Sequence, residues 1–187
     1  MINKKSDKSI DSKFNIIAES ANNFRVEMIR YLGYNDSLQI LELSKELEHV
    51  FGIDAILTES NIKKYFNDKT FPFVARLNDN IIGFIIGVPL EVFSEESWSH
   101  YDINLGKENT IYTYMFLVKS FYRKTSGHSK ILKLIYVNWC KKNNFKYITG
   151  HVKNGISSNF SKETIVVKIF PKWYNSNIPF EYYRRPL

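Results

Sequence analysis

The strongest constraint on the fold is a continuous run in which a strand, a helix and a second strand follow one another. Residues 110–118 read TIYTYMFLV, and their aromatic and β-branched side chains favour a largely buried strand. The pattern predicts a helix over residues 126–142 and a second strand over FKYITGHV, residues 145–152. A strand that returns through one helix lies parallel to the first strand in the same sheet. We therefore expect an α/β protein in which these two strands are parallel neighbours.

A β-hairpin is expected immediately before this unit. Two apolar runs, FPFVARL and IIGFIIGVPL, flank a polar turn at residues 78–80, which is the pattern of an antiparallel strand pair. Further upstream, residues 24–32 can alternate as a strand. Asp36 is expected to cap the start of a helix over residues 36–52, and a second short helix is expected after residue 58.

The two ends of the chain are less regular. Residues 1–13 are rich in Lys and Ser and are expected to form a flexible N-terminal arm. Residues 14–187 are expected to form a single domain, because the chain of 187 residues has the usual length of one domain. Near the C-terminus we expect a short helix over residues 161–168, then strands around residues 167–173 and 180–184.

Composition excludes several classes of protein. Hydrophobic residues make up 44% of the chain and aromatic residues 16%, which predicts a globular fold. No apolar run approaches the roughly 18 residues that span a bilayer, so a soluble, cytoplasmic protein without a membrane partner is expected. The single Cys140 excludes an internal disulfide, and the histidines are scattered, so no metal site is predicted.

Positive charge is concentrated in one segment. The chain carries a formal net charge of +7, and residues 119–153 contain nine Lys or Arg residues and no Asp or Glu. In the same segment a strand runs into the start of a helix, where unpaired backbone N–H groups and the helix dipole favour a phosphate. Charge and backbone both predict an anion site, although a basic helix can also be an ordinary solvated face.

The spacing of residues 118–132, VKSFYRKTSGHSKIL, is more informative than their charge. This stretch resembles the acyl-CoA pyrophosphate loop of the GNAT (GCN5-related N-acetyltransferase) superfamily, written Val-x-Pro-x-Tyr-Arg-x-x-Gly-x-Gly/Ala-x-x-Leu-Leu. Ser126 and His128 stand at the two small-residue positions, with Gly127 between them. The order of elements from about Phe24 onward also matches. The resemblance implies a GNAT-like mixed central β-sheet flanked by helices, and an acyl-CoA-dependent N-acyltransferase, most simply an N-acetyltransferase.

The resemblance also implies which residues contact acetyl-CoA or another acyl-CoA. Backbone amides of the loop are expected to bind the pyrophosphate, and the end of the preceding strand is expected to face the pantetheine. Asparagines after the next strand are expected to reach pantetheine or adenine-side groups. By match, the expected cofactor-binding residues are Leu117, Val118, Arg123, Lys124, Thr125, Ser126, Gly127, His128, Ser129, Asn154 and Asn159.

The catalytic groups follow the family pattern only in part. Acyl transfer from a thioester to an amine needs an unprotonated nucleophile, a polarised carbonyl and a proton for the leaving thiolate. The resemblance implies a Glu base on or beside the strand at residues 110–118, which contains no carboxylate. The remaining base candidates are Glu108, Glu91 and His151, and the acid candidate is Tyr174. Each of them also has a plain structural role, and proximity alone can carry such a reaction.

The acceptor and the partners are the least constrained. Residues 91–109 hold five acidic residues against one Lys, and an acidic loop over the acceptor side would favour a cationic amine on a small molecule or a peptide. Three alternatives stay open: a GNAT-fold protein that binds without turnover, an acyl-carrier protein as the donor, and a basic nucleic-acid-binding face. The oligomeric state is also open, a homodimer included.

Overall fold

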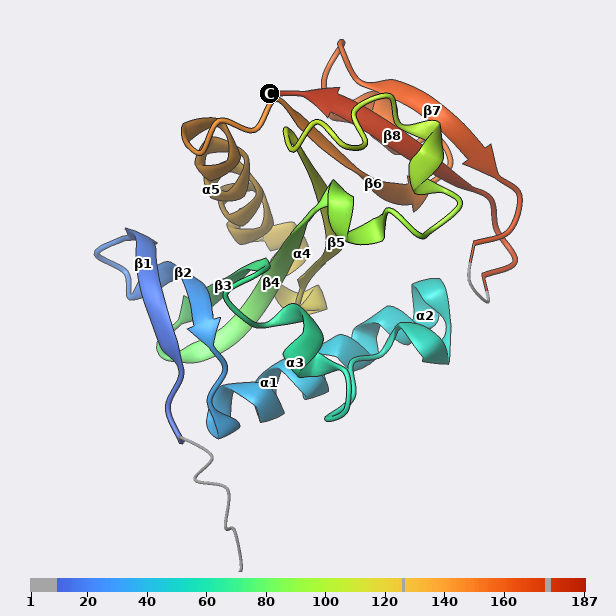
Figure 1. Cartoon of the computed structure of the whole chain (residues 1–187). Coiled ribbons are helices and arrows are strands. Elements are labelled where there is room, and N and C mark those ends of the chain that lie inside the picture. The colour runs from blue at the N-terminus through green and yellow to red at the C-terminus, as the bar shows by residue number, and fades with distance from the viewer. Residues whose placement is uncertain (1–9, 126, 174–175) are drawn as a thin grey trace, which may run out of the picture.

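A mixed eight-stranded sheet forms the centre of the computed structural model, which describes residues 10–125, 127–173 and 176–187 (Figure 1). The spatial order of the strands is β1-β2-β3-β4-β5-β6-β8-β7. Only β5 and β6 pair in parallel; the other neighbours in this order are antiparallel. The predicted α/β fold with a mixed central sheet is confirmed. The strands are β1 (Lys13–Glu19), β2 (Phe24–Tyr31), β3 (Phe71–Leu77), β4 (Asn80–Pro89), β5 (Thr110–Val118), β6 (Tyr147–Lys153), β7 (Ile165–Phe170) and β8 (Phe180–Pro186).

Helices cover both faces of this sheet: α5 lies on one face and α1 on the other (Figure 1). No helix among the described residues combines the length and the apolar character needed to cross a bilayer. The α-helices are α1 (Tyr34–Ser44), α2 (Glu48–Phe51), α3 (Ile62–Tyr65), α4 (Ser120–Thr125) and α5 (His128–Lys142). Short 3₁₀ turns are η1 (Lys45–Leu47), η2 (Ile53–Ala55), η3 (Leu90–Phe93), η4 (Ser99–Tyr101) and η5 (Ser157–Asn159).

Strands β3 and β4 are apolar on both faces because each face carries its own core. Phe73 packs toward α5 in one cluster with Leu132 and Tyr136. Its neighbour Val74 packs in a second cluster with Ile40 of α1, since successive side chains of a strand point to opposite faces. The unbroken apolar runs of the predicted hairpin therefore reflect burial on both sides. The hairpin and the parallel strand pair are both confirmed.

A buried ion cluster also holds α1 against the sheet. The guanidinium of Arg76 on β3 lies 2.8 Å from the Asp36 carboxylate and 3.0 Å from the Glu27 carboxylate on β2. The prediction that Asp36 caps the helix is wrong, because α1 begins at Tyr34 and Asp36 lies in its first turn. Burial alone would raise the pKa of Asp36, but hydrogen bonds from Arg76 and Ser12, together with the charges of Arg76 and Arg25, outweigh burial and lower it.

Other element boundaries differ from the sequence expectation. The expected helix over residues 36–52 divides into α1, η1 and α2. The helix expected to begin at residue 126 begins at His128, and a separate α4 precedes it. Gly127 lies between these helices in the left-handed region, with φ of 69°, which interrupts a continuous helix.

The ends of the chain contain the clearest errors. The expected helix over residues 161–168 is wrong, because residues 165–170 form β7 and pair with β8. Three β-branched residues in a row, beginning at Ile165, favour this extended pairing. Strand β1 was not expected, and it begins at Lys13, the last residue of the expected N-terminal arm. The part of that arm over residues 1–9 lies outside the described residues.

Candidate active site

The parallel strands β5 and β6 separate partway along their length. Their registered pairs run only from Thr110 with Tyr147 to Tyr112 with Thr149. At the next position, Gly150 lies so close to β5 that a Cβ atom would meet the Thr113 carbonyl oxygen at 3.2 Å. Beyond this point the facing edges of both strands have no registered partner across the gap. The geometry therefore leaves backbone N–H and C=O groups available to a ligand.

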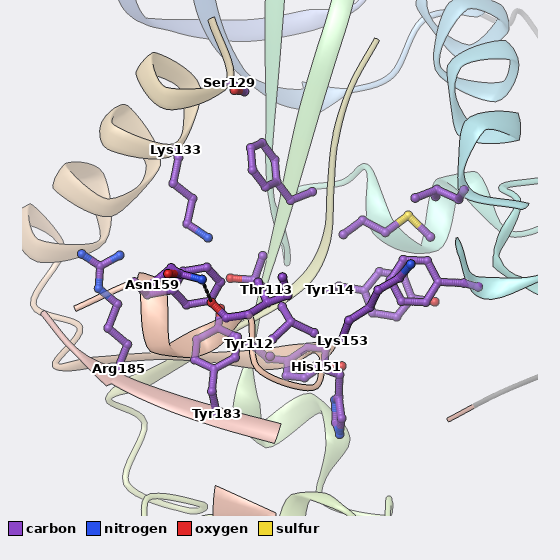
Figure 2. A pocket seen from close by; sticks show the side chains of 18 of the residues that line it. Tyr112, Thr113, Tyr114, Ser129, Lys133, His151, Lys153, Asn159, Tyr183 and Arg185 are labelled. Carbon is purple, nitrogen blue, oxygen red and sulfur yellow. Dashed lines mark hydrogen bonds between the residues drawn. The ribbon is translucent and has the colours of Figure 1, made fainter. Parts of the chain in front are cut away.

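A cavity of about 690 Å³ occupies this fork (Figure 2). Its walls come from β5, β6, α5, the η5 segment, β8 and the α2–η2 segment. Aromatic and aliphatic side chains predominate, and Asp54 is the only carboxylate among the described residues that line it. The charged and polar lining residues on the helical and β8 side are Ser129, Lys130, Lys133, Asn159 and Arg185.

The start of α5 forms one end of the cavity. Ser129 and Lys130 lie in the first turn of this 15-residue helix and line the cavity wall. The first N–H groups of a helix have no intrahelical acceptor, and together with the helix dipole they favour an anion. A Cβ on Gly127 would meet nothing within 4 Å, so its positive φ, rather than crowding, is what favours glycine there. The start of α5 and the fork thus line one cavity.

The structure places the strand residues of the cavity a short distance from where the sequence predicted them. Leu117 and Val118 are buried in the two opposite cores and do not line the cavity. The lining positions of β5 are instead residues 112–116. The register of β4 against β5 shifts between Ile86 and Gly87, which places one extra residue on β5.

Arg123 and His128 of the predicted loop make contacts with protein groups. Arg123 donates to the Val118 carbonyl oxygen at 2.6 Å and pairs with Glu46 at 2.8 Å. The His128 ring stacks on Phe24 with centroids 4.7 Å apart, so this side chain packs against β2. Lys124 and Thr125 end α4, and Ser126 lies outside the described residues.

Only one of the two predicted asparagines lines the cavity. Asn159 lines the cavity, where its side-chain amide donates to the Ile156 carbonyl oxygen at 3.3 Å. Asn154 does not line it, and its backbone N–H donates to the Pro179 carbonyl oxygen at 3.0 Å. Of the two, Asn159 is therefore the one positioned to meet a ligand.

His151 lies in the cavity wall, as its selection as a catalytic candidate requires. Its Nδ1 is 2.8 Å from the Tyr112 hydroxyl, and its ring stacks on Trp173 with centroids 3.5 Å apart. Burial lowers the pKa of His151 to about 3. The ring is thus neutral near pH 7, and the disfavoured imidazolium makes it a weak proton acceptor.

The acidic candidates lie away from the cavity wall. Glu91 accepts a hydrogen bond from the Glu108 backbone N–H at 2.9 Å, and neither residue lines the cavity. Asp102 of the same loop is buried and is paired with Arg184 at 3.0 Å. The loop therefore offers less free negative charge than its composition suggests. Tyr174 lies outside the described residues, although its neighbour Trp173 lines the cavity.

Sequence reasoning did not single out Lys133, Arg185 or Tyr183, all of which line the cavity. A signal existed for Lys133, because it lies one helical turn after Ser129 on the same face of α5. Arg185 had no local signal, since it reaches the site only because β8 pairs with β6, with Ile148 opposite Arg185. Burial raises the pKa of Tyr183 to about 12, so its hydroxyl stays protonated near neutral pH.

Comparison with known proteins identifies solved structures of similar fold. No protein-family model matches the chain, and no curated protein matches it. Among solved structures, it is similar to ribosomal-protein-S18-alanine N-acetyltransferase from Escherichia coli, with 12% identity, a TM-score of 0.63, and 87% of this chain and 93% of that chain covered. A GCN5-related N-acetyltransferase from Kribbella flavida has 17% identity, a TM-score of 0.62, and 90% and 100% coverage.

A third similar structure is a GNAT family acetyltransferase from Elizabethkingia anophelis with acetyl-CoA bound, with 14% identity and a TM-score of 0.54. It covers 89% of this chain and 99% of that chain. Identities this low show the fold and no more. The chain has the GNAT fold, which confirms the architecture expected from the sequence.

Proposed function

We propose that this protein is an acyl-CoA-dependent N-acyltransferase that transfers an acyl group directly to an amine. The observation that carries this proposal is the fork between β5 and β6, which opens a cavity of about 690 Å³ with the start of α5 at one end. A long thioester with phosphates at one end matches both features. The GNAT fold supports the same class of reaction.

The residues of this chain fit an acyl-CoA. The N-terminal turn of α5, with Ser129 and Lys130, suits the pyrophosphate. The free edge of β5 beyond Tyr112 offers backbone groups that can pair with pantetheine amides, and Asn159 offers a side-chain amide nearby. Because a backbone N–H needs no reorganisation, one on this edge can also polarise the thioester carbonyl.

The reaction needs little from charged side chains. The amine nitrogen attacks the thioester carbonyl carbon, the C–S bond breaks, the amine loses a proton and the thiolate gains one. His151 is poorly suited as the base, since burial disfavours its cation. We assign the main contribution to positioning, with solvent as the proton acceptor. Tyr174 stays a predicted acid, next to the cavity-lining Trp173.

The acceptor end of the cavity suits a cationic amine with an apolar portion. Asp54 is the one carboxylate among the described residues that line the cavity, which Phe51, Tyr114 and Lys153 also line. Tyr114 stacks on Tyr65 with centroids 4.1 Å apart, which holds its ring in place. Asp54 thus takes the role that the sequence suggested for residues 91–109. A small-molecule amine and a peptide amine both fit this description.

Thermal unfolding with and without acetyl-CoA tests the proposal, because a ligand that binds only the native state raises the midpoint. The sharpest variant is Ser129→Glu. A carboxylate in the first turn of a helix favours the helix but repels phosphate, so the variant should keep its fold and lose the shift. Ser129→Ala, the matched control, should keep the shift. Absence of a shift in the wild type at about millimolar acetyl-CoA would contradict the proposal.

Release of free CoA thiol in the presence of a panel of amines then tests transfer. Release that depends on the amine supports an N-acyltransferase. A thermal shift without release by any amine would favour the alternative in which the fold binds a CoA-like ligand without turnover. Salt-sensitive binding of an oligonucleotide without any acetyl-CoA shift would favour the nucleic-acid alternative.

A further inference from the structure

Two cations that line the cavity have no acidic partner among the described residues. Lys133 projects from α5, and Arg185 lies on β8. Neither residue takes part in an ion pair among the described residues, and the Nε atom of Arg185 is buried without a hydrogen-bond partner there. The single lining carboxylate, Asp54, comes from the α2–η2 segment. This half of the cavity thus holds positive charge without a counterion.

Lys133 lies among aromatic side chains. Its Nζ lies 4.8 Å from the centre of the Phe160 ring and 5.4 Å from the centre of the Phe116 ring, and these cation–π contacts offset only part of the cost of burying its charge. Burial and, to a smaller extent, the nearby charge of Arg185 lower the pKa of Lys133 to about 8, while Cys140 acts in the opposite direction. Burial raises the pKa of the Cys140 thiol to about 12, so it supplies no negative charge near neutral pH. An anion entering between the two cations would relieve both.

The position of the pair indicates which anion. The phosphate-binding end of the cavity is the first turn of α5, at Ser129 and Lys130. Lys133 lies one turn further along α5, and Figure 2 shows its side chain pointing away from Ser129, toward Asn159 and Thr113 at the fork. The pair therefore lies beyond the phosphate-binding end, on the side where the acyl group of a bound donor would end.

We infer that Lys133 and Arg185 form a carboxylate-binding site that selects a dicarboxylic acyl-CoA, such as succinyl-CoA or malonyl-CoA, as the donor. This inference rests on the proposed function. The terminal carboxylate of the acyl group would lie between the Lys133 ammonium and the Arg185 guanidinium. The protonated Tyr183 hydroxyl, in the same wall, is a further hydrogen-bond donor.

Isothermal titration calorimetry with CoA, acetyl-CoA and succinyl-CoA tests this without requiring turnover. Succinyl-CoA should bind at least about tenfold more tightly than acetyl-CoA, because charge-assisted hydrogen bonds form only with the carboxylate. In Lys133→Met and in Arg185→Met this ratio should fall to about one. Lys130→Met should weaken all three ligands alike, since Lys130 lies at the phosphate end. Lys141→Met, which removes an exposed charge from the last turn of the same helix, should change none of them.

Proton uptake gives a second readout. At pH 8, Lys133 is about half protonated, so binding of a carboxylate beside it should take up to about half a proton from the buffer. Titrations in buffers of different ionisation enthalpy measure this uptake. It should accompany succinyl-CoA and disappear in Lys133→Met, whereas acetyl-CoA should show less uptake.

The outcomes separate the inference from the proposed function. No binding of any CoA ester would contradict the proposed function itself. Equal binding of acetyl-CoA and succinyl-CoA, with both weakened by Lys133→Met, would assign the pair to the phosphates and overturn the inference. The inference would also be overturned if Lys133→Met and Arg185→Met weakened the binding of an amino-acid acceptor, which carries a carboxylate, but left the ratio of succinyl-CoA to acetyl-CoA binding unchanged. Because each ratio is taken within one variant, a lower folded fraction does not imitate these results.

Discussion

Two groups of partly or fully buried cations in this protein differ in their counterions. Arg76, between β3 and α1, has carboxylates at 2.8 Å and 3.0 Å and is 5% exposed. Lys133 and Arg185, in the cavity wall, have no carboxylate partner among the described residues. A paired buried charge holds elements in place, whereas an unpaired one is retained at a cost to stability. The difference separates a structural cation from cations available to a ligand.

Arg76→Met removes the buried cation that is paired with carboxylates. It should lower the free energy of unfolding by about 3–5 kcal/mol, because the Asp36 and Glu27 carboxylates would stay buried without Arg76. Urea unfolding measures the change, with Lys141→Met as an exposed control. A loss below about 1 kcal/mol would show that Arg25, which also pairs with Glu27, and water compensate for the missing guanidinium.

His151 extends the comparison to a cavity residue that avoids charge altogether. Its folded pKa of about 3 lies below the ordinary value of 6.5, so the unfolded state takes up the proton first as the pH falls. Stability should therefore be lost on acidification below pH 6.5. Between pH 7 and pH 5 the wild type should lose about 2 kcal/mol more than His151→Phe, which cannot titrate. Urea unfolding at several pH values measures this difference.

An NMR titration checks the same claim directly. The ring resonances of His151 should keep nearly constant shifts from pH 8 to pH 5, because the folded ring stays neutral there. A midpoint between pH 6 and pH 7 would show that the imidazolium is tolerated. Such a result would restore His151 as a base candidate and weaken the contrast with Arg76.

Lys133→Met tests the cost of a cation that has no carboxylate partner. The folded pKa of Lys133, about 8, lies below its ordinary 10.5, so its charge destabilises the fold below pH 8 and is relieved as the pH rises toward 10.5. The variant should be more stable than the wild type at pH 7, by about 1 kcal/mol after allowance for partial solvent exposure. This gain should shrink between pH 8 and pH 10.5. A destabilised variant would show that the stem of Lys133 contributes more through packing than its charge costs.

Arg76→Met and Lys133→Met are expected to change stability in opposite directions. The sequence predictions also divide into two groups, elements that were found and elements that were missed. The hairpin and the parallel unit were predictable, because strands buried on both faces read as long apolar runs and the turn between β3 and β4 is local. Strand β1 was missed because its side chains are mostly exposed and its short alternation of Phe14, Ile16 and Ala18 directly follows the Lys- and Ser-rich N-terminal arm. Strand β7, exposed in the same way, was taken partly for a helix.

The site was predictable only where it depends on one segment. Ser129, which lines the cavity, was among the residues implied by the resemblance of residues 118–132, where a strand, a turn and a helix start lie together in the chain. The cation pair was not predicted, because Arg185 joins Lys133 only through the pairing of β8 with β6. Asp36 was taken for a helix cap for the same reason, since its partner Arg76 lies 40 residues away in the sequence.

The ion pair of Arg123 with Glu46 is exposed to solvent, unlike the buried cations above. Removing it should cause the smallest change in the free energy of unfolding. The two side chains are 44% and 32% exposed, so solvent screens their attraction. Glu46 also accepts a hydrogen bond from the Ser120 backbone N–H at 3.1 Å, at the start of α4. Glu46→Gln keeps an acceptor there and removes the charge. It should lower the free energy of unfolding by less than about 1 kcal/mol in urea.

The same variant tests what Arg123 does in the loop. If Arg123 acts by holding the turn between β5 and α4, Glu46→Gln should leave the acetyl-CoA midpoint shift nearly unchanged, because Arg123 still donates to the Val118 carbonyl oxygen. A stronger shift in the variant would mean that Glu46 normally withholds a guanidinium from the phosphates. Arg123 would then belong with Lys133 and Arg185 as a cation available to the ligand, and exposure alone would not separate structural from functional charge.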